Sequence, residues 1–147
     1  MSKVIVRYAA QKKTYHIDDA VVETGWLPGQ AFKLANDGLT AELAVGDDTM
    51  FIAVDDDDEL SSPPTGSLGT FVFGSGTEII IDHSEEVAAA SAVRAYAAGV
   101  ESANASANLY INSNSKWDTI ATGSVKGKLS EIPNANNNYR LGVILRF

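Results

Sequence analysis

The amino-acid sequence predicts a mainly β protein folded as one domain of residues 1–147. Two observations lead to this expectation. Both ends of the chain read as strands, Val4–Tyr8 and Leu141–Phe147, although chain ends fray unless something ties them down. Between these ends, short apolar runs alternate with turn residues, which is typical of all-β proteins. A chain of this length buries about 68–70% of its unfolded surface, so it folds without a disulfide or a metal.

The first 54 residues predict five strands joined by tight turns. Pro28-Gly29 and Asp37-Gly38 are strong turn signals, because glycine supplies the positive φ that tight turns require. Apolar and polar residues alternate in Leu39–Val45, which is the pattern of a half-buried strand. We expect residues 31–54 to form a meander with short loops. The expected strands are Val4–Tyr8, Thr14–Ile17, Ala31–Leu34, Leu39–Val45 and Thr49–Val54.

An acidic stretch followed by prolines interrupts this pattern. Asp55–Glu59 places like charges side by side, and Pro63-Pro64 lacks two backbone donors, so we expect an exposed loop outside any sheet. A second hairpin is expected after the loop. Its strands are Gly69–Phe73 and Glu78–Asp82, and its turn is Gly74–Gly76.

Residues 84–98 are the one helix candidate. Ser84 suits an N-cap and Gly99 suits a C-terminal cap, and the stretch between them is rich in alanine. Apolar residues from Val93 onward also recur at helical spacing. The alternative is an extended segment, since residues 93–96 alternate as well. The sequence therefore predicts either one short Ala-rich helix or an extended connection.

The last third returns to strands and polar turns. Leu109–Ile111 leads into a polar tip that returns at Trp117, and Ser124–Ile132 contains the next strand. Asparagine is concentrated in this third and reads as turn chemistry, because its side chain bonds its own backbone and tolerates the left-handed region. Apolar side chains alternate through Tyr139–Phe147. We expect this closing strand to be structural, with Phe147 at least partly buried.

The net charge of −8 is unevenly distributed. Residues 1–16 carry four bases and no acid, residues 17–86 carry sixteen acids and one base, and residues 87–147 carry six bases and three acids. Nucleic-acid binding needs clustered Lys and Arg, so we expect no nucleic-acid partner. The asymmetry suits a protein that meets partners through complementary patches, and the simpler alternative is that the acids keep the surface soluble.

The composition also bounds the chemistry and the location of the protein. Cysteine is absent, which excludes disulfides, thiol chemistry and Cys-type zinc sites. The first residues lack the apolar core of a signal peptide. No apolar run approaches the roughly 18 residues of a membrane helix. We expect synthesis in a cytoplasm and no membrane partner.

Candidate catalytic and metal-binding residues are few. His16 and His83 each have a nearby acid, yet no serine stands in a Gly-x-Ser-x-Gly elbow, so a small hydrolase is the weakest hypothesis. Surface positions at strand ends are the default for both histidines. Asp55–Glu59 is the one candidate calcium loop, although its contiguous acids lack the alternating spacing and the glycine of such loops. We expect no enzymatic activity, no cofactor and no bound metal.

Three aromatic residues are candidates for a carbohydrate-binding face: Trp26, Trp117 and Tyr110. Aromatic residues in β proteins are more often core or interface anchors. A carbohydrate-binding module therefore remains an alternative hypothesis.

Several segments together resemble the small β-rich decoration, or cement, proteins on the capsids of tailed bacteriophages. The resemblance covers residues 24–147, and the Ala-rich segment 87–98 departs from it. The segment at Thr24–Leu34 precedes a short hairpin and an acidic, proline-bearing loop, and the segment at Arg140–Phe147 closes the chain. The segments are TGWLPGQAFKL at Thr24–Leu34, NLYINSNSKWDT at Asn108–Thr119, GKLSEIP at Gly127–Pro133 and RLGVILRF at Arg140–Phe147.

This resemblance implies a small β-barrel or β-tulip-like body of short antiparallel strands without enzymatic activity. It also implies non-covalent binding to the outside of a capsid, so that the protein is made in the host bacterial cytoplasm and ends on the virion exterior. The implied partners are the major capsid protein and further copies of the chain, as a homotrimer or a dimer. The alternatives are a carbohydrate- or calcium-binding β module, or another phage structural protein such as a head-fibre or tail component.

Residues 1–16 are predicted to be the docking strand or arm. A basic edge strand adds to a neighbouring sheet by backbone pairing, and its charges set the orientation. The alternative is an internal edge strand whose lysines only guard against aggregation. The residues expected at the interface are Lys3, Val4, Val6, Arg7, Tyr8, Trp26, Arg146 and Phe147.

Overall fold

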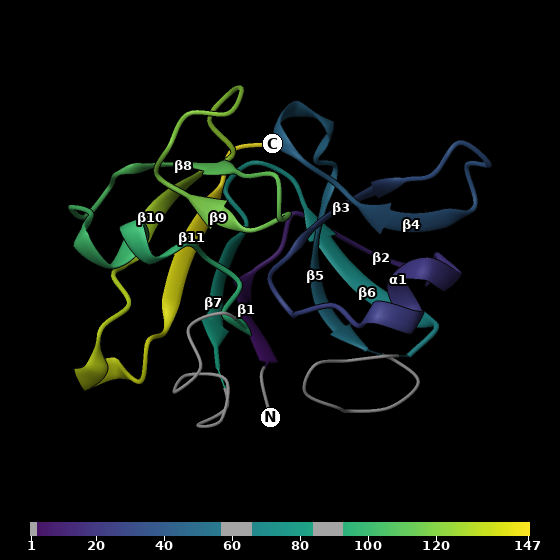
Figure 1. The fold of residues 1–147 in the computed structure, drawn as a ribbon. Helices are drawn as coiled ribbons and strands as arrows, with labels where there is room; N and C mark the ends of the chain where they lie inside the picture. Colours follow the sequence, from purple (N-terminus) through teal and green to yellow (C-terminus); the bar gives the residue numbers. More distant parts are fainter. Residues whose placement is uncertain (1–2, 57–65, 84–92) are drawn as a thin grey trace.

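The chain folds into a closed five-stranded barrel and a six-stranded antiparallel sheet, in a computed structural model that describes residues 3–56, 66–83 and 93–147. Figure 1 shows the barrel in the right half of the view and the sheet in the left half. The chain begins at the lower end of the molecule and finishes at the upper end. The prediction of a mainly β, barrel-containing protein is confirmed.

The barrel strands follow the order β2-β4-β3-β5-β6 and then return to β2. Every pair is antiparallel except β2 and β4, which run parallel. Because β4 lies between β2 and β3, β5 pairs with β3, and the expected meander over residues 31–54 is wrong. The strands are β2 (Gln11–Ile17), β3 (Ala31–Leu34), β4 (Thr40–Leu43), β5 (Phe51–Asp56) and β6 (Leu68–Phe73).

Aromatic side chains fill the barrel. The rings of Phe32 and Phe71 lie 5.0 Å apart between centroids, and Trp26 meets Phe32 edge-on at 5.8 Å. Phe51 packs 6.0 Å from Phe71. Such tilted and edge-on pairs add about 0.5–1.5 kcal/mol each beyond their buried area. The barrel is therefore a packed core and not an open channel.

The six-stranded sheet has the order β1-β7-β11-β10-β8-β9. Its outermost strands come from the beginning of the chain and from the last third, so the sheet joins distant parts of the sequence. The strands are β1 (Lys3–Tyr8), β7 (Glu78–Asp82), β8 (Asn108–Ile111), β9 (Trp117–Asp118), β10 (Gly127–Glu131) and β11 (Leu141–Leu145).

The expected hairpin of Gly69–Phe73 and Glu78–Asp82 does not form. β6 pairs with β2 and β5 in the barrel, whereas β7 pairs with β1 and β11 in the sheet. The turn between them takes the chain from one layer to the other. The reason is that the final strand supplies its hydrogen-bond partners: Gly74 N–H donates to the Phe147 carbonyl at 2.8 Å, and Gly76 N–H donates to the Leu145 carbonyl at 2.9 Å.

One apolar cluster joins the two layers. Ile79 and Val143 on the inner face of the sheet belong to the same buried cluster as Ile52 and Val72 of the barrel. The indole N–H of Trp117, which belongs to this cluster, donates to the Gly29 carbonyl in the segment before β3 at 3.1 Å. The barrel and the sheet therefore share a core, as one domain does.

The closing strand β11 is part of this core. Its inward side chains, Leu141, Val143 and Leu145, are fully buried, while Ile144 points to the other face and is half-buried. Phe147 is also half-buried and packs against the core cluster. The prediction that the C-terminal strand is structural and that Phe147 is partly buried is confirmed.

Within the described ranges the structure contains a short α-helix that was not predicted from the sequence, α1 (Asp19–Thr24). The Asp18 carboxylate caps it by accepting a hydrogen bond from Ala20 N–H at 2.9 Å. Among the described residues no helix is long and apolar enough to cross a membrane. The described part of the chain also contains the 3-10 turns η1 (Gly46–Asp48), η3 (Ala98–Ser102) and η4 (Ala135–Asn137).

The Ala-rich helix predicted over residues 84–98 lies largely outside the described residues, since residues 84–92 are not described. Its last turn is not α-helical. Tyr96 is in an isolated parallel bridge with Trp117, and Trp117 N–H donates to the Ala95 carbonyl at 3.1 Å. These contacts hold the backbone extended until the 3-10 turn begins at Ala98.

The acidic stretch begins inside the barrel and not after it. Asp55 and Asp56 are the last residues of β5 and pair with Thr70 and Gly69 of β6. The expectation that all of Asp55–Glu59 stays outside any sheet is therefore wrong for its first two residues, because backbone pairing across a β-bulge carries the strand on. The remainder of this stretch lies outside the described residues.

Candidate functional site

β1 forms one edge of the sheet, and its second side has no strand partner among the described residues. Val4 is buried and Val6 is half-buried against the core, so these two predicted interface residues mainly anchor the strand. Ile5 points to the opposite face and is 37% exposed, and Tyr8 at the end of the strand is 60% exposed. The surface that remains for a partner is the outer edge together with these outward side chains.

The basic residues of β1 face an acidic neighbour within the same sheet. Lys3 lies opposite Asp82 in the register of β1 and β7, and the Arg7 guanidinium is 3.9 Å from the Glu78 carboxylate. Both basic side chains are exposed. Ion pairs of this kind contribute about 0–1 kcal/mol, so both charges stay available to a partner as well.

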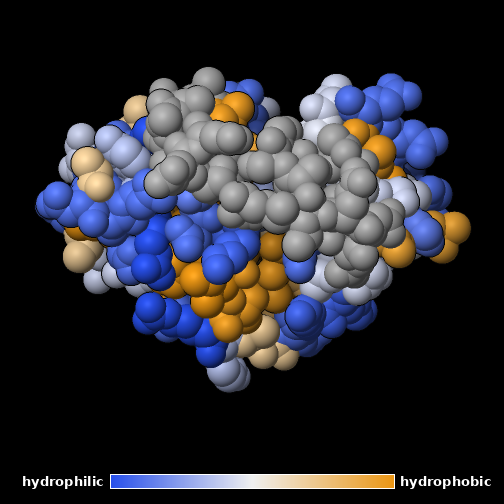
Figure 2. Space-filling view, turned by 90° about the horizontal axis from the view of Figure 1, so that it is seen from below, coloured by the Kyte–Doolittle hydropathy of each residue, from blue (hydrophilic) through white to orange (hydrophobic). Residues whose placement is uncertain are grey.

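The N-terminal segment is built into the fold and is not a projecting arm. Residues 3–8 form β1 of the sheet, and residues 11–17 form β2, which closes the barrel against β4 and β6. Figure 2 views the end of the molecule at which β1 begins and shows an apolar area in the middle of that face, flanked by hydrophilic surface. The segment therefore offers a partner the exposed side chains of β1 and not a projecting arm.

The other predicted interface residues are not part of this surface. Trp26 is only 1% exposed and packs inside the barrel, so the expectation that its side chain meets a partner is wrong. Arg146 is exposed, and its backbone N–H donates to the Lys126 carbonyl at 2.9 Å. Phe147 has the Lys126 ammonium 5.6 Å from its ring centroid. These last two residues lie at the end of the molecule opposite the start of β1 (Figure 1).

His83 is a structural histidine in the interior. It is only 3% exposed, which corrects the expectation of a surface position, whereas His16 is exposed. Its Nε2 accepts a hydrogen bond from Ala95 N–H at 3.3 Å, so its Nδ1 carries the proton and donates to the Tyr139 carbonyl at 3.1 Å. Burial lowers the pKa of the imidazole from 6.5 to about 4. Both ring nitrogens are thus occupied by backbone, which leaves neither for acid–base catalysis.

An ion pair between buried Arg94 and half-buried Glu101 lies beside this histidine. Arg94 donates to the Glu101 carboxylate at 2.5 Å, and the Tyr96 hydroxyl donates to the same oxygen at 3.3 Å. The guanidinium also stacks 3.8 Å from the centroid of the Tyr139 ring. Burial raises the pKa of the Tyr96 hydroxyl, which stays protonated as a donor. This network links η3 to the loop before β11, and its role is structural.

The described acidic residues do not gather into a metal site: no group of three His, Asp or Glu side chains comes together within the ranges given above. Asp47 of η1 instead accepts hydrogen bonds from the Ser124 hydroxyl at 2.6 Å and the Ser124 backbone N–H at 2.7 Å. These bonds lower the pKa of the Asp47 carboxyl. Asp47 therefore links two loops, and the candidate calcium loop Asp55–Glu59 lies mostly among residues that are not described.

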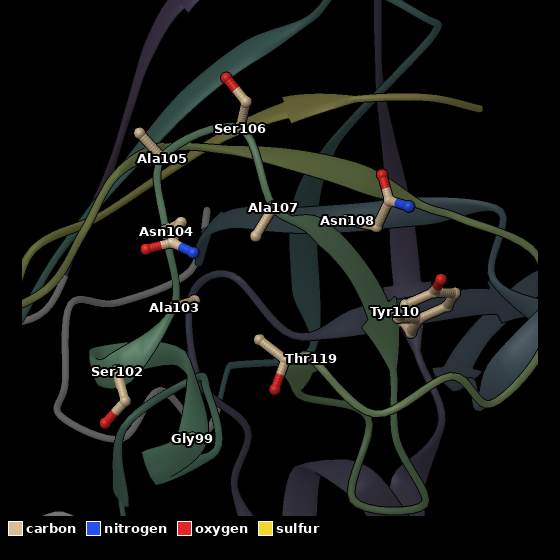
Figure 3. Close-up of a pocket in the computed structure, with 10 residues that line it drawn as sticks. All are labelled: Gly99, Ser102, Ala103, Asn104, Ala105, Ser106, Ala107, Asn108, Tyr110 and Thr119. Atoms are coloured by element: carbon tan, nitrogen blue, oxygen red, sulfur yellow. The ribbon is translucent and has the colours of Figure 1, made fainter.

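A polar groove of about 550 Å³ opens beside β8, and we refer to it as the η3–β8 groove. Figure 3 shows it between the segment that joins η3 to β8 and Thr119, which follows β9. Trp26 and Trp117 are buried elsewhere as core anchors, so the alternative of a carbohydrate face lined by these two tryptophans does not hold. Only Tyr110 of that set borders the groove. The lining residues are Gly99, Ser102, Ala103, Asn104, Ala105, Ser106, Ala107, Asn108, Tyr110 and Thr119.

Two features of these surfaces were not predicted from the sequence. The outward direction of the Ile5 side chain could have been predicted from the alternation of β1. Val4 and Val6 face the core, so the residue between them must face outward. The η3–β8 groove carried no such signal. Its lining comes from the stretch Gly99–Tyr110 and from Thr119, and these residues form no recognisable motif.

Comparisons with known proteins add no family. No protein-family model matches the chain, and no curated protein matches it significantly.

Proposed function

We propose that this chain is a virion structural protein that binds non-covalently to the outer surface of a tailed-phage capsid. The observation that carries the proposal is the edge strand β1, whose outward side chains combine apolar and basic character. An unpaired strand edge is a template for pairing with another chain. The resemblance to capsid decoration proteins supplies the kind of partner, namely the major capsid protein and further copies of this chain, as a homotrimer or a dimer.

The rigid, doubly layered β body supports this role. Its core is shared between barrel and sheet, so β1 is held in place before it meets a partner and little ordering is needed on binding. A protein that binds only the assembled lattice stabilises it by mass action, by about 2.7 kcal/mol per site when its free concentration is a hundredfold above the dissociation constant. Repetition over many sites then reinforces the shell without any chemical reaction.

Co-sedimentation with capsids tests the proposal. The purified chain is mixed with capsids assembled from the major capsid protein of the same phage, and bound protein is measured at increasing concentration. We expect saturable binding that weakens as salt rises, because the exposed Lys3 and Arg7 charges are screened. Absence of saturable binding at any salt concentration would contradict the proposal.

Two matched variants test the contribution of β1. Ile5→Asp places a charge on the apolar part of the proposed surface, and Leu39→Asp makes the same change at a residue that is 73% exposed in the β3–β4 turn of the barrel. We expect the first variant to lose at least about tenfold in affinity, the equivalent of 1.4 kcal/mol, and the second to bind like the native chain. Equal binding by both variants would remove β1 from the interface.

A further inference from the structure

We propose that the η3–β8 groove binds an uncharged, hydroxyl-rich ligand, namely a neutral saccharide unit. This proposal is independent of the capsid-binding role, because the groove borders β8, while β1 is at the other edge of the sheet.

The lining of the groove carries no charged side chain. None of the ten lining residues is Lys, Arg, His, Asp or Glu. The nearest base in the register is Lys128, opposite Asn108, and its ammonium donates to the Asn108 side-chain oxygen and is therefore engaged. A phosphate, carboxylate or ammonium ligand would find no counter-charge in this lining. The groove therefore favours a neutral ligand.

The lining also supplies hydrogen-bonding groups. The side chains of Asn104, Tyr110 and Thr119 line the groove and make no hydrogen bond within the described residues. The amide offers donors and an acceptor, and each hydroxyl offers both. Engagement of its oxygen by Lys128 also leaves the Asn108 amide nitrogen as a donor. This mixture of donors and acceptors matches sugar hydroxyls, which act as both.

The shape of the groove also suits a sugar ring. Figure 3 shows Ala107 and Thr119 on opposite sides of the open space, with Asn104 on the same segment as Ala107 and the Tyr110 ring at one end. Gly99 and the alanines of the lining have no large side chains, so a ring-sized ligand reaches the backbone at the bottom of the groove. An aromatic ring offers a flat apolar face to the C–H groups of a sugar ring, and its hydroxyl remains a polar handle. The groove is wide open to solvent, which suits one or two units of a longer chain.

The backbone of β8 also has hydrogen-bonding groups that an extended peptide would use. Leu109 and Ala107 direct their carbonyls to the β10 side, accepting from Lys126 N–H and Leu129 N–H at 2.9 Å each. By alternation, Asn108 directs its backbone groups to the other side, where β9 has already ended. A single free backbone position gives a peptide strand too little pairing, so we favour the saccharide, and a peptide becomes an outcome of the test.

Ligand-observed NMR with the full-length chain tests the proposal. The probes are a neutral hexose trisaccharide, a trisaccharide of uronic acids and a capped Ala-Ser-Ala tripeptide. We expect saturable binding of the neutral trisaccharide and at least about tenfold weaker binding of the other two. Tighter binding of the charged sugar or of the peptide would overturn the proposal, as would failure of all three probes to bind.

Variants locate the binding. Tyr110→Ala removes the ring and is expected to weaken binding about tenfold, whereas Tyr110→Phe keeps the ring and loses only the hydroxyl, with a smaller effect. Asn104→Ala tests the amide in an exposed loop where folding is not at risk. Tyr8→Ala, at the exposed end of β1, is the matched control and should leave sugar binding unchanged. Sugar binding that survives both Tyr110→Ala and Asn104→Ala would show that the ligand binds elsewhere and would refute the proposal.

Discussion

Because His83 is buried in its neutral form, the stability of the folded protein should fall in acid. A shift from pH 7 to pH 5 tests this. In the native state the pKa of the imidazole is lowered from 6.5 to about 4, first because of burial and then because Arg94 is nearby. Its Nε2 also accepts from Ala95 N–H, so a proton there would face a donor. The unfolded chain gains the proton below pH 6.5, and the native state does not until about pH 4.

The free energy of unfolding is therefore highest above pH 6.5 and falls as the pH drops toward 4. Over the full window the difference of pKa between 6.5 and about 4 corresponds to about 3 kcal/mol. Between pH 7 and pH 5 the expected loss is about 2 kcal/mol, which lowers the melting temperature of a domain of this size by about 4–8 °C. Asp37 and Asp47, whose carboxyl pKa values are lowered by hydrogen bonds, lose their contribution only below this window.

Urea titrations at pH 7, 6 and 5 measure this loss, with His83→Gln as the test and His16→Gln at the exposed histidine as the control. The His83 variant should be less stable at pH 7 but nearly independent of pH from 7 to 5. The His16 variant should keep the native pH dependence. If His83→Gln retained the whole loss of about 2 kcal/mol, or if His16→Gln abolished it, the assignment of the acid sensitivity to His83 would be wrong.

Three further outcomes are expected from the packing. Deleting Val143–Phe147 should abolish folding, measured by circular dichroism, because each buried apolar side chain contributes about 1.5–3 kcal/mol and the total exceeds typical spare stability; a soluble, cooperatively melting truncation would contradict this. Gly29→Ala should destabilise by about 1–3 kcal/mol more than Gly38→Ala in chemical denaturation, because both have positive φ but only an alanine at 29 would clash with Ile81; equal losses would refute the packing argument. Asp56→Asn/Asp58→Asn should change the melting temperature little with or without millimolar calcium, and a calcium-dependent rise of several degrees in the native chain, lost in the variant, would indicate a metal site.

The sequence predicted strands well where burial on one face leaves a local pattern. β3 and β7 match the expected Ala31–Leu34 and Glu78–Asp82 in full, and β11 has the expected alternation of buried and outward side chains. The partners of these strands were less accessible. The Gly74–Gly76 turn signal was real, but a turn specifies where the chain bends and not which strand it will pair with.

The misassigned residues have physical reasons of the same kind. Trp26 carries a large apolar surface, and the sequence cannot say whether that surface faces a core or a partner. His83 is buried with both ring nitrogens hydrogen-bonded to the backbone of Ala95 and Tyr139, partners 12 and 56 residues along the chain that a local pattern does not reveal. α1 was detectable in principle from Asp18 as an N-cap and Gly25 after the last turn, but six residues give almost no periodicity.

Imaging of capsid particles with and without this protein tests the central claim most directly. Particles of the same phage that lack the protein are compared by electron cryomicroscopy with particles to which the purified chain has been added back. We predict additional density on the outer surface at symmetry-related positions, fitted by the barrel and sheet with β1 against the lattice or against another copy. Identical maps, or density confined to the tail or to a head fibre, would contradict the account.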